Sequence, residues 1–299
     1  IEQSSLFRVR MGNSRYTIMA STTDVHVLNL NKTPDSGIKP AVELSNLLQK
    51  MMLRLKGDYM TPDGKVVDYK KLKESQLFRD YKEQAAHLQD VNLDFSSEQE
   101  KKAFFINIYN ALTIHGLVEQ DELPSSVLQI QQFWKKTGYK IGGYIFSLDD
   151  MEHGVLRGNR SHPASTLPHF ENNDPRLKFI VKQLDPRIHF ALVCGAKSCP
   201  AINVYTADNL DMALDAATRS FCAQEISISL EGDEIWLSKI FQWYQKDFGH
   251  MEVDVIRWTE KYLEPNIKDR AHILGTKLET LGNISVKYSD YDWKLNNIE

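Results

Sequence analysis

The sequence has few cysteines and no long apolar run, and each of these shortages excludes a class of protein. The 299 residues include only three cysteines, too few and too odd a number for a secreted scaffold held by disulfides. No stretch approaches the roughly 18–20 apolar residues of a membrane-spanning helix, and the first twenty residues lack the pattern of a signal peptide. We therefore expect a cytoplasmic protein that does not insert into a membrane.

An excess of charge of one sign is also lacking. The chain carries 36 Lys+Arg against 40 Asp+Glu, a formal net charge of −4, so no overall field attracts nucleic acid. No Gly-x-Gly-x-x-Gly or phosphate-loop pattern occurs, which removes the common nucleotide-binding motifs. We expect no nucleic-acid partner. The expected partner is an unidentified small molecule or peptide, and the sequence leaves any cofactor unknown.

The composition that remains is that of a globular protein, with 42% hydrophobic and 25% charged residues. Residues 1–40 hold short β-prone pieces interrupted by proline and glycine, and we expect an extended arm or the tail of a preceding domain there. The first residue is Ile1 rather than Met, which indicates a chain cut from a longer one. Since no linker or repeat divides the rest, residues 41–299 are predicted to form a single domain.

Hydrophobic periodicity predicts a helical first half. Apolar residues recur at three- and four-residue steps from Ala41, with Gly57 at the place of a helix C-cap. A second helical pattern covers residues 69–88. Ser97-Glu98-Gln99-Glu100 has the form of a capping box. The helix that follows is apolar nearly all round over residues 103–116, as in a helix buried on every side.

Strand patterns become frequent in the second half. We predict strands over 139–146, 188–194, 226–230, 234–237 and 284–288, with helices at about 148–157, 174–184, 207–224, 238–248, 253–263 and 266–280. The strands at 226–230 and 234–237 are close enough to form a hairpin. The predicted fold class is therefore α+β, mostly helical with a short mixed β-sheet.

Two asparagines stand on the buried helix and form the first candidate for chemistry. Asn107 and Asn110 are three residues apart and therefore share one face. An unpaired amide costs on the order of 1–3 kcal/mol when buried, so each needs a partner. They either tie neighbouring loop backbone to the core or line a site.

The second candidate is Ser147-Leu148-Asp149-Asp150-Met151-Glu152-His153-Gly154-Val155-Leu156-Arg157. Ser147 is placed as a helix N-cap, and acids in a first turn suit the helix dipole. Asp149 and His153 are four residues apart, so the carboxylate can orient the imidazole, with Arg157 one turn further on. The alternative is plain capping chemistry.

The third candidate is the segment from Ile188 to Pro200. Its apolar run predicts a strand buried on both faces, with His189 at its entrance and Cys194 at its exit. Cys199 follows in a Gly/Ser/Pro loop, and active sites commonly collect in such loops. A cysteine near His⁺, Lys or a helix N-terminus is a nucleophile. Catalytic or redox thiols, two buried structural thiols and a metal site all remain open, although the spacing is a weak zinc signal.

Other conspicuous residues are assigned to the core. Trp236, Trp243, Trp258 and Trp293 fall at core-like spacings among apolar neighbours, so we expect them to pack. Cys222 lies on the apolar side of a predicted helix and is expected to be an inert buried thiol.

These segments together resemble the domain of unknown function 547 (DUF547) family. The matching pieces are Phe104 to Leu112, Ser147 to Arg157, His189 to Pro200, and Tyr291 to Asn296. The family name carries no activity. What the resemblance implies is context, because some animal members carry glutaredoxin-like or DEP-like modules ahead of this domain. We therefore expect covalently linked N-terminal modules and a domain of the DUF547 type over residues 41–299.

Two functions from different classes fit these residues. The first is a cysteine- and histidine-dependent hydrolase or acyl transferase, in a distant papain- or transglutaminase-like arrangement. In this enzyme, Cys194 or Cys199 is the nucleophile and His189 or His153 is the base. Glu152 or Asp150 is the carboxylate that orients the base, and Asn107 or Asn110 polarises the substrate carbonyl. The second is a non-catalytic interaction or redox-regulatory module attached to other domains. The first function requires the three segments to meet at one cleft.

Overall fold

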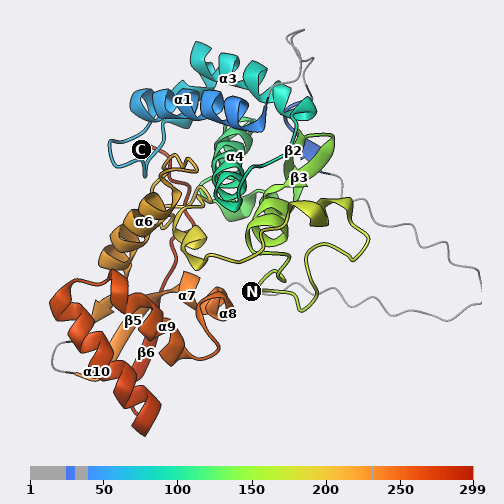
Figure 1. Ribbon diagram of the computed structural model, residues 1–299. Coiled ribbons are helices and arrows are strands. Elements are labelled where there is room, and N and C mark those ends of the chain that lie inside the picture. Colours follow the sequence, from blue (N-terminus) through green and yellow to red (C-terminus); the bar gives the residue numbers. More distant parts are fainter. Residues whose placement is uncertain (1–24, 31–39, 230–231, 299) are drawn as a thin grey trace, which may run out of the picture.

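The computed structural model describes residues 25–30, 40–229 and 232–298, and helices dominate them (Figure 1). The predicted α+β class is confirmed, since the described helices accompany two small three-stranded sheets. Most of the predicted N-terminal arm, residues 1–24 and 31–39, lies outside the described residues. The described piece at His26–Val27 forms strand β1.

The first half is helical as predicted, with two differences in detail. Helix α1 (Ala41–Tyr59) runs through Gly57 and ends at Met60, so this glycine is not the C-cap. The predicted helix over 69–88 is divided at Ser75 into α2 (Tyr69–Glu74) and α3 (Gln76–Ala86). Ser75 breaks it because its backbone is extended and its hydroxyl caps α3 by accepting from the amide of Phe78.

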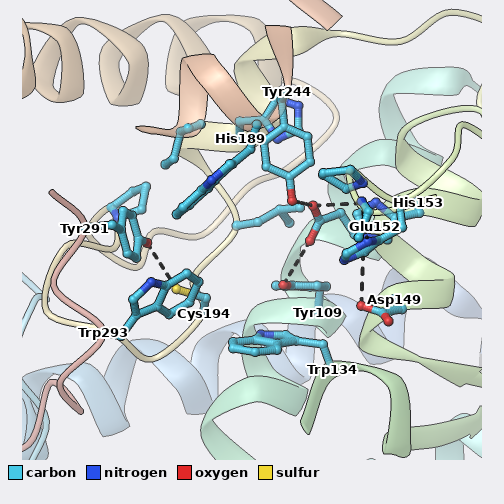
Figure 2. A pocket seen from close by; sticks show the side chains of 17 residues that line it. Tyr109, Trp134, Asp149, Glu152, His153, His189, Cys194, Tyr244, Tyr291 and Trp293 are labelled. Atoms are coloured by element: carbon cyan, nitrogen blue, oxygen red, sulfur yellow. Dashed lines mark hydrogen bonds and ion pairs between the residues drawn. The ribbon is translucent and has the colours of Figure 1, made fainter. Parts of the chain in front are cut away.

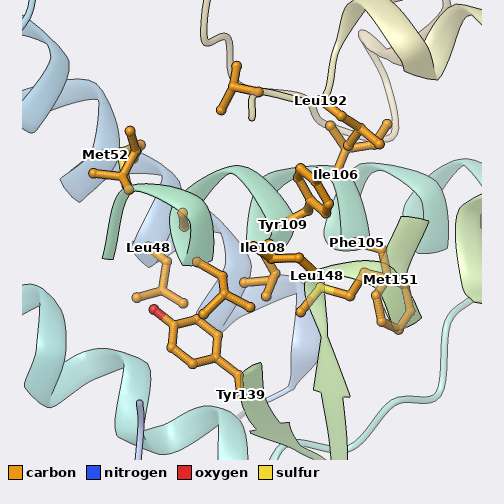
Figure 3. Close-up of a cluster of buried hydrophobic side chains, with 14 of the residues drawn as sticks. Leu48, Met52, Phe105, Ile106, Ile108, Tyr109, Tyr139, Leu148, Met151 and Leu192 are labelled. Carbon is orange, nitrogen blue, oxygen red and sulfur yellow. The ribbon is translucent and has the colours of Figure 1, made fainter. Parts of the chain in front are cut away.

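Helix α4 (Glu98–Val118) is the centre of the first core. Ser97 caps it by accepting from the amide of Glu100, as predicted. The helix is buried from Ala103 to Val118 because other elements cover it on every side. Figure 3 shows the side chains of α1, of α4 and of the first sheet meeting around it. The residues labelled there are Leu48, Met52, Phe105, Ile106, Ile108, Tyr109, Tyr139, Leu148, Met151 and Leu192.

The strand predicted over 139–146 is divided into two strands, because the chain turns at Gly142 and Gly143. Strands β2 (Thr137–Ile141) and β3 (Tyr144–Ser147) are antiparallel, and β1 pairs with β2 in parallel. The turn between β2 and β3 consists of two glycines with φ of 55° and 86°, a backbone region that disfavours other residues. Shortly after this hairpin the chain forms η3 (Asp150–Leu156), which is a π-helix.

The second core is formed by the C-terminal part. The predicted hairpin is confirmed as β4 (Ser227–Ile228) and β5 (Glu234–Ser238), and β6 (Ser285–Ser289) lies parallel to β5. Helices α6 (Leu210–Glu225) and α10 (Pro265–Leu281) cover it (Figure 1). The second core also contains α7 (Lys239–Trp243), α8 (Gln245–Phe248), α9 (Glu252–Thr259) and η6 (Glu260–Tyr262). The short elements η1 (His87–Asp90), η2 (Val127–Gln129), α5 (Phe133–Lys136) and η4 (Pro175–Phe179) belong to the first core.

The predicted buried strand over residues 188–194 is wrong. The chain forms a short 3₁₀-helix there, η5 (Pro186–Phe190), followed by irregular backbone. Asp185 caps η5 through the amide of Arg187, and Pro186 occupies its first position. Periodicity cannot separate a buried strand from a buried irregular segment, because both are apolar throughout. The predicted helix over 174–184 is likewise reduced to η4.

The last described residues return from the second core to the first. Isolated bridges join Lys294 to Ser126, Leu295 to Ala196, and Asn297 to Val67. The segment that contains Tyr291 and Trp293 is thereby held against the loop of residues 194–200. No helix among the described residues is sufficiently long and apolar to span a bilayer.

Candidate functional site

A pocket of about 420 Å³ opens where the two cores meet. Figure 2 shows its floor formed by Tyr109 and Trp134, with His189 and Tyr244 opposite them, carboxylates at one end and Cys194 at the other. It is lined by Tyr109, Trp134, Asp149, Glu152, His153, His162, Pro163, Ala164, His189, Leu192, Cys194, Pro200, Ile240, Trp243, Tyr244, Tyr291 and Trp293. Mostly apolar walls with a few convergent polar groups are typical of ligand sites.

The structure brings together four of the residues that the sequence selected. Glu152, His153, His189 and Cys194 all line this pocket. Asn107, Asn110 and Cys199 do not line it.

Asn107 and Asn110 hold backbone instead. Asn107 donates to the carbonyl of Tyr205 at 2.6 Å and accepts from the amide of the same residue at 2.9 Å. Asn110 donates to the carbonyl of Ala191 and accepts from the amide of Val193, both at 2.9 Å. These paired bonds fix the irregular chain after η5 onto α4, where no sheet satisfies its backbone.

The π-helix η3 presents the carboxylate end of the pocket. Its wide turn closes through a bond from the amide of Arg157 to the carbonyl of Glu152, five residues apart. Ser147 and Asp150 form a reciprocal cap before it, since each side chain accepts from the other's amide. Asp150 also binds His169 and Arg176. It is therefore a structural anchor of η3 and does not orient a pocket histidine.

Glu152 is held ionised between two tyrosines. Its Oε1 accepts from the hydroxyl of Tyr244 at 2.6 Å and its Oε2 from that of Tyr109 at 3.2 Å. Burial raises the pKa of Glu152, but the hydrogen bond from Tyr244 and the positive charge of Arg157 oppose burial, and the pKa lies below its usual value. The carboxylate is therefore charged at neutral pH.

His153 is neutral and has one nitrogen occupied. Arg157 Nη1 lies 2.9 Å from His153 Nδ1, and because a guanidinium only donates, Nδ1 is the acceptor. Burial lowers the pKa of His153 to about 3. Its Nε2 lies 3.9 Å from Asp149 Oδ1. A base needs a free lone pair, so this geometry does not equip His153 to accept a proton.

His189 is oriented by a fully buried aspartate that the sequence did not single out. Asp247 Oδ2 lies 2.8 Å from His189 Nε2, and Arg157 donates hydrogen bonds to both oxygens of the same carboxylate. Burial raises the pKa of Asp247, but its hydrogen bonds to His189 and Arg157 outweigh burial and hold the pKa well below its usual range. The ionised carboxylate accepts, so Nε2 of His189 carries the proton. The imidazole also stacks on Tyr244, with ring centroids 4.0 Å apart.

Asp149 is the least satisfied charged group of the pocket. Its side chain is 20% exposed, and among the described residues it has no hydrogen-bond donor. Burial, followed by the negative charge of Glu152, raises the pKa of Asp149 to about 7. Strongly perturbed groups of this kind concentrate at functional sites.

Cys194 and Cys199 form a disulfide, with Cα atoms 6.1 Å apart. The hydroxyl of Tyr291 lies 3.2 Å from the sulfur of Cys194 and 3.3 Å from that of Cys199. Cys194 faces the pocket, whereas Cys199 lines a smaller depression on another side. Cys222 is free and buried, as predicted, and burial raises its pKa to about 12.

Several residues of the site were missed from the sequence. Tyr244, which lines the pocket, and Asp247, which binds His189, lie in a short stretch that has no motif to mark them. Trp243 and Trp293 were assigned to packing, but both line the pocket, and Trp236 is 37% exposed. Spacing alone cannot distinguish an aromatic of the core from one on the wall of a cavity.

In the described part of the chain, no three His, Cys, Asp or Glu side chains are placed to share a metal ion.

The protein family described as "Protein of unknown function, DUF547" matches residues 93–222 of this chain. No curated protein and no solved structure matches the chain. The pocket combines that matched stretch with residues beyond it, because Tyr244, Tyr291 and Trp293 come later in the sequence.

Proposed function

Since this chain is a DUF547 domain-containing protein, a family without an assigned activity, we propose a function from its pocket: a hydrolase or acyl transferase that uses Cys194 as nucleophile and His189 as base. Asp247 orients the base. The analogy with papain- and transglutaminase-like enzymes is one of roles only.

The observation that carries the proposal is the way His189 is held. Its Nε2 is committed to Asp247, whereas its Nδ1 has no hydrogen-bond partner among the described residues. A neutral imidazole with its proton on Nε2 has its lone pair on Nδ1. His189 and Cys194 line the same pocket. A base oriented by a buried carboxylate beside a nucleophile is the logic of catalytic triads.

The proposed chemical step uses these two side chains. Cys194 in its thiol form loses the Sγ proton to His189 Nδ1 as sulfur bonds to an acyl carbon. The leaving group then departs with that proton from His189, and a thioester remains on Cys194. His189 then removes a proton from water, or from a second nucleophile in a transferase, as that nucleophile bonds to the acyl carbon. The thioester bond breaks, and Cys194 Sγ leaves with the proton from His189. The hydroxyl of Tyr291, next to the sulfur, is placed to donate to the developing oxyanion.

The thiol form requires that the Cys194–Cys199 disulfide be reduced. A dithiol reductant supplies the two electrons and two protons and is itself oxidised to a disulfide. The cytoplasm expected from the sequence keeps thiols reduced. In the oxidised state the same pocket is a binding site without a nucleophile, and this observation favours the second candidate function, a non-catalytic or redox-regulatory module.

Differential alkylation tests the proposal. After treatment with a dithiol, native protein is exposed to iodoacetamide at pH 7, and the modified cysteines are identified by mass spectrometry. We expect Cys194 to react faster than an ordinary thiol of pKa ~8.5, and the variant His189→Gln to remove this advantage. Cys222 is the internal control and stays unmodified.

An assay of activated acyl esters completes the test. We expect turnover by the reduced protein, none by Cys194→Ser, and unchanged turnover by Cys222→Ala. If reduced Cys194 is no more reactive than ordinary thiols and no ester is cleaved, the catalytic proposal is wrong and the binding module takes its place.

A further inference from the structure

The charge of the pocket is confined to one end. Of the described residues that line it, Asp149 and Glu152 carry carboxylates, and none is a lysine or arginine. The nearest guanidinium, that of Arg157, lies behind the wall, where it binds Asp247 and stacks over the ring of Tyr244. Lys135 borders the adjoining groove rather than the pocket. The interior therefore has a negative potential.

The opposite part of the pocket is aromatic. Trp293 contacts Tyr291, Trp243 and Trp134, with ring centroids 4.6, 5.6 and 5.8 Å apart. All four rings line the pocket. Ring faces carry negative electrostatic potential and attract cations, while the same surfaces exclude water.

Together, these surfaces select a ligand by charge. A neutral ligand would leave the carboxylate of Asp149 desolvated without a partner, and an anion would be repelled by both carboxylates. A cation gains from the carboxylates and from the rings at once. A compact cation also fits the volume of about 420 Å³, which is within the range of small-molecule sites.

We infer that this pocket recognises an organic cation, an ammonium group carried by the substrate, which lies between the aromatic rings of Trp134, Trp243, Tyr291 and Trp293 and the carboxylates of Asp149 and Glu152. The inference deepens the proposed function by naming a substrate class for the same pocket. Because it concerns binding alone, it does not depend on a reaction at Cys194.

Three ligands of nearly identical shape test this charge selection by calorimetry. They are choline, its neutral isostere 3,3-dimethylbutan-1-ol, and the anion 3,3-dimethylbutanoate. We expect choline to bind at least about tenfold more tightly than the neutral compound, with no binding of the anion. The measurement uses the full chain at pH 8, where Asp149 is largely ionised.

Matched variants locate the effect. Asp149→Asn is expected to reduce the preference for choline to about threefold or less, and Trp293→Leu to weaken choline binding about tenfold. Asp290→Asn is the control, because that carboxylate is fully exposed, pairs with Lys239 and does not line the pocket. Equal or tighter binding of the neutral isostere, no binding of choline, or a preference that survives in Asp149→Asn would overturn the inference.

The outcome is separable from that of the catalytic proposal. Choline has no acyl group, and its binding is measured on Cys194→Ser as well as on the native chain. Choline selectivity with an unreactive Cys194 leaves the cation site standing and removes the hydrolase. A reactive Cys194 with no charge selectivity removes the cation site and leaves the hydrolase standing.

Discussion

Asp247 Oδ2 accepts a hydrogen bond from His189 Nε2 at 2.8 Å and another from Arg157 Nε at 2.6 Å. One buried oxygen thus links the imidazole of the pocket to the guanidinium that also binds His153. His153 and His189, two of the histidines that line the pocket, are therefore fixed by one ionic cluster, and a change in its carboxylate affects both of them.

Replacing Asp247 by asparagine should reduce activity and stability together. The amide cannot balance Arg157, and breaking a buried ion pair costs about 3–5 kcal/mol. It also permits the wrong tautomer of His189, so turnover per folded molecule should fall on the order of 10²-fold or more. Thermal melts and ester turnover on the folded fraction provide the measurements. Turnover within twofold of native would remove Asp247 from the catalytic role.

Asp149 should make stability fall as the pH rises. Its folded pKa of about 7 lies above the ordinary aspartate value of 3.8, so between these values the folded state binds more protons than the unfolded state, and unfolding becomes easier with increasing pH. The groups that act on it are Glu152 and Asp150, which raise the pKa, and His169 and Lys135, which lower it, while burial is the largest cause.

Asp149→Asn should therefore raise the melting temperature at pH 8 and leave it nearly unchanged at pH 4. The relevant measurement is a series of thermal melts from pH 4 to 8. Asp290→Asn, at a fully exposed site, should show no such dependence. A uniform shift at every pH would mean that the carboxylate is not the source of the effect.

Asn107→Ala should destabilise the fold without changing the pocket. The substitution orphans both the carbonyl and the amide of Tyr205, which costs on the order of 1–3 kcal/mol. Choline affinity and turnover per folded molecule should stay at native values. Urea unfolding together with calorimetry measures the two properties. Asn92→Ala is the matched control, because this exposed amide donates to the nearby Asp94 and does not contribute to the core.

Gly154→Ala should be destabilising although alanine is the better helix former. A Cβ at this position would lie 2.2 Å from the ring of Phe170, and such overpacking costs about 1–3 kcal/mol. Phe170→Leu should restore part of the loss when combined with it, giving a non-additive pair in a double-mutant cycle. Additive losses from the two changes would show that the ring contact is not what requires glycine.

The sequence was most informative where a local signal and burial agree. The capping box at Ser97 and the apolar run after it predicted α4, and the close spacing of the patterns at 226–230 and 234–237 predicted the hairpin of β4 and β5. The segment at 188–194 was predicted wrongly because Asn110 of a distant helix, rather than a neighbouring strand, satisfies its backbone. No local pattern contains that information.

The same reason limits the prediction of the site. Glu152, His153, His189 and Cys194 stood out because each is polar or reactive inside an apolar pattern. Asp247 stands in a polar stretch, where an aspartate is ordinary, and only the folded chain buries it against His189. Asn107 stood out for the same reason as the site residues, but its amide forms hydrogen bonds with the backbone of Tyr205 instead of lining the pocket.

The return of the last described residues to the first core sets the order in which the pocket can form during synthesis. Tyr291 and Trp293 are translated after every other residue that lines the cavity, because the other walls come from residues 109–244. A chain still on the ribosome can bury α4 and form the first sheet, since domains fold as they emerge. Its pocket then lacks one aromatic wall until residues 291–297 dock against the earlier loops, so ligand binding begins only after these residues have been made.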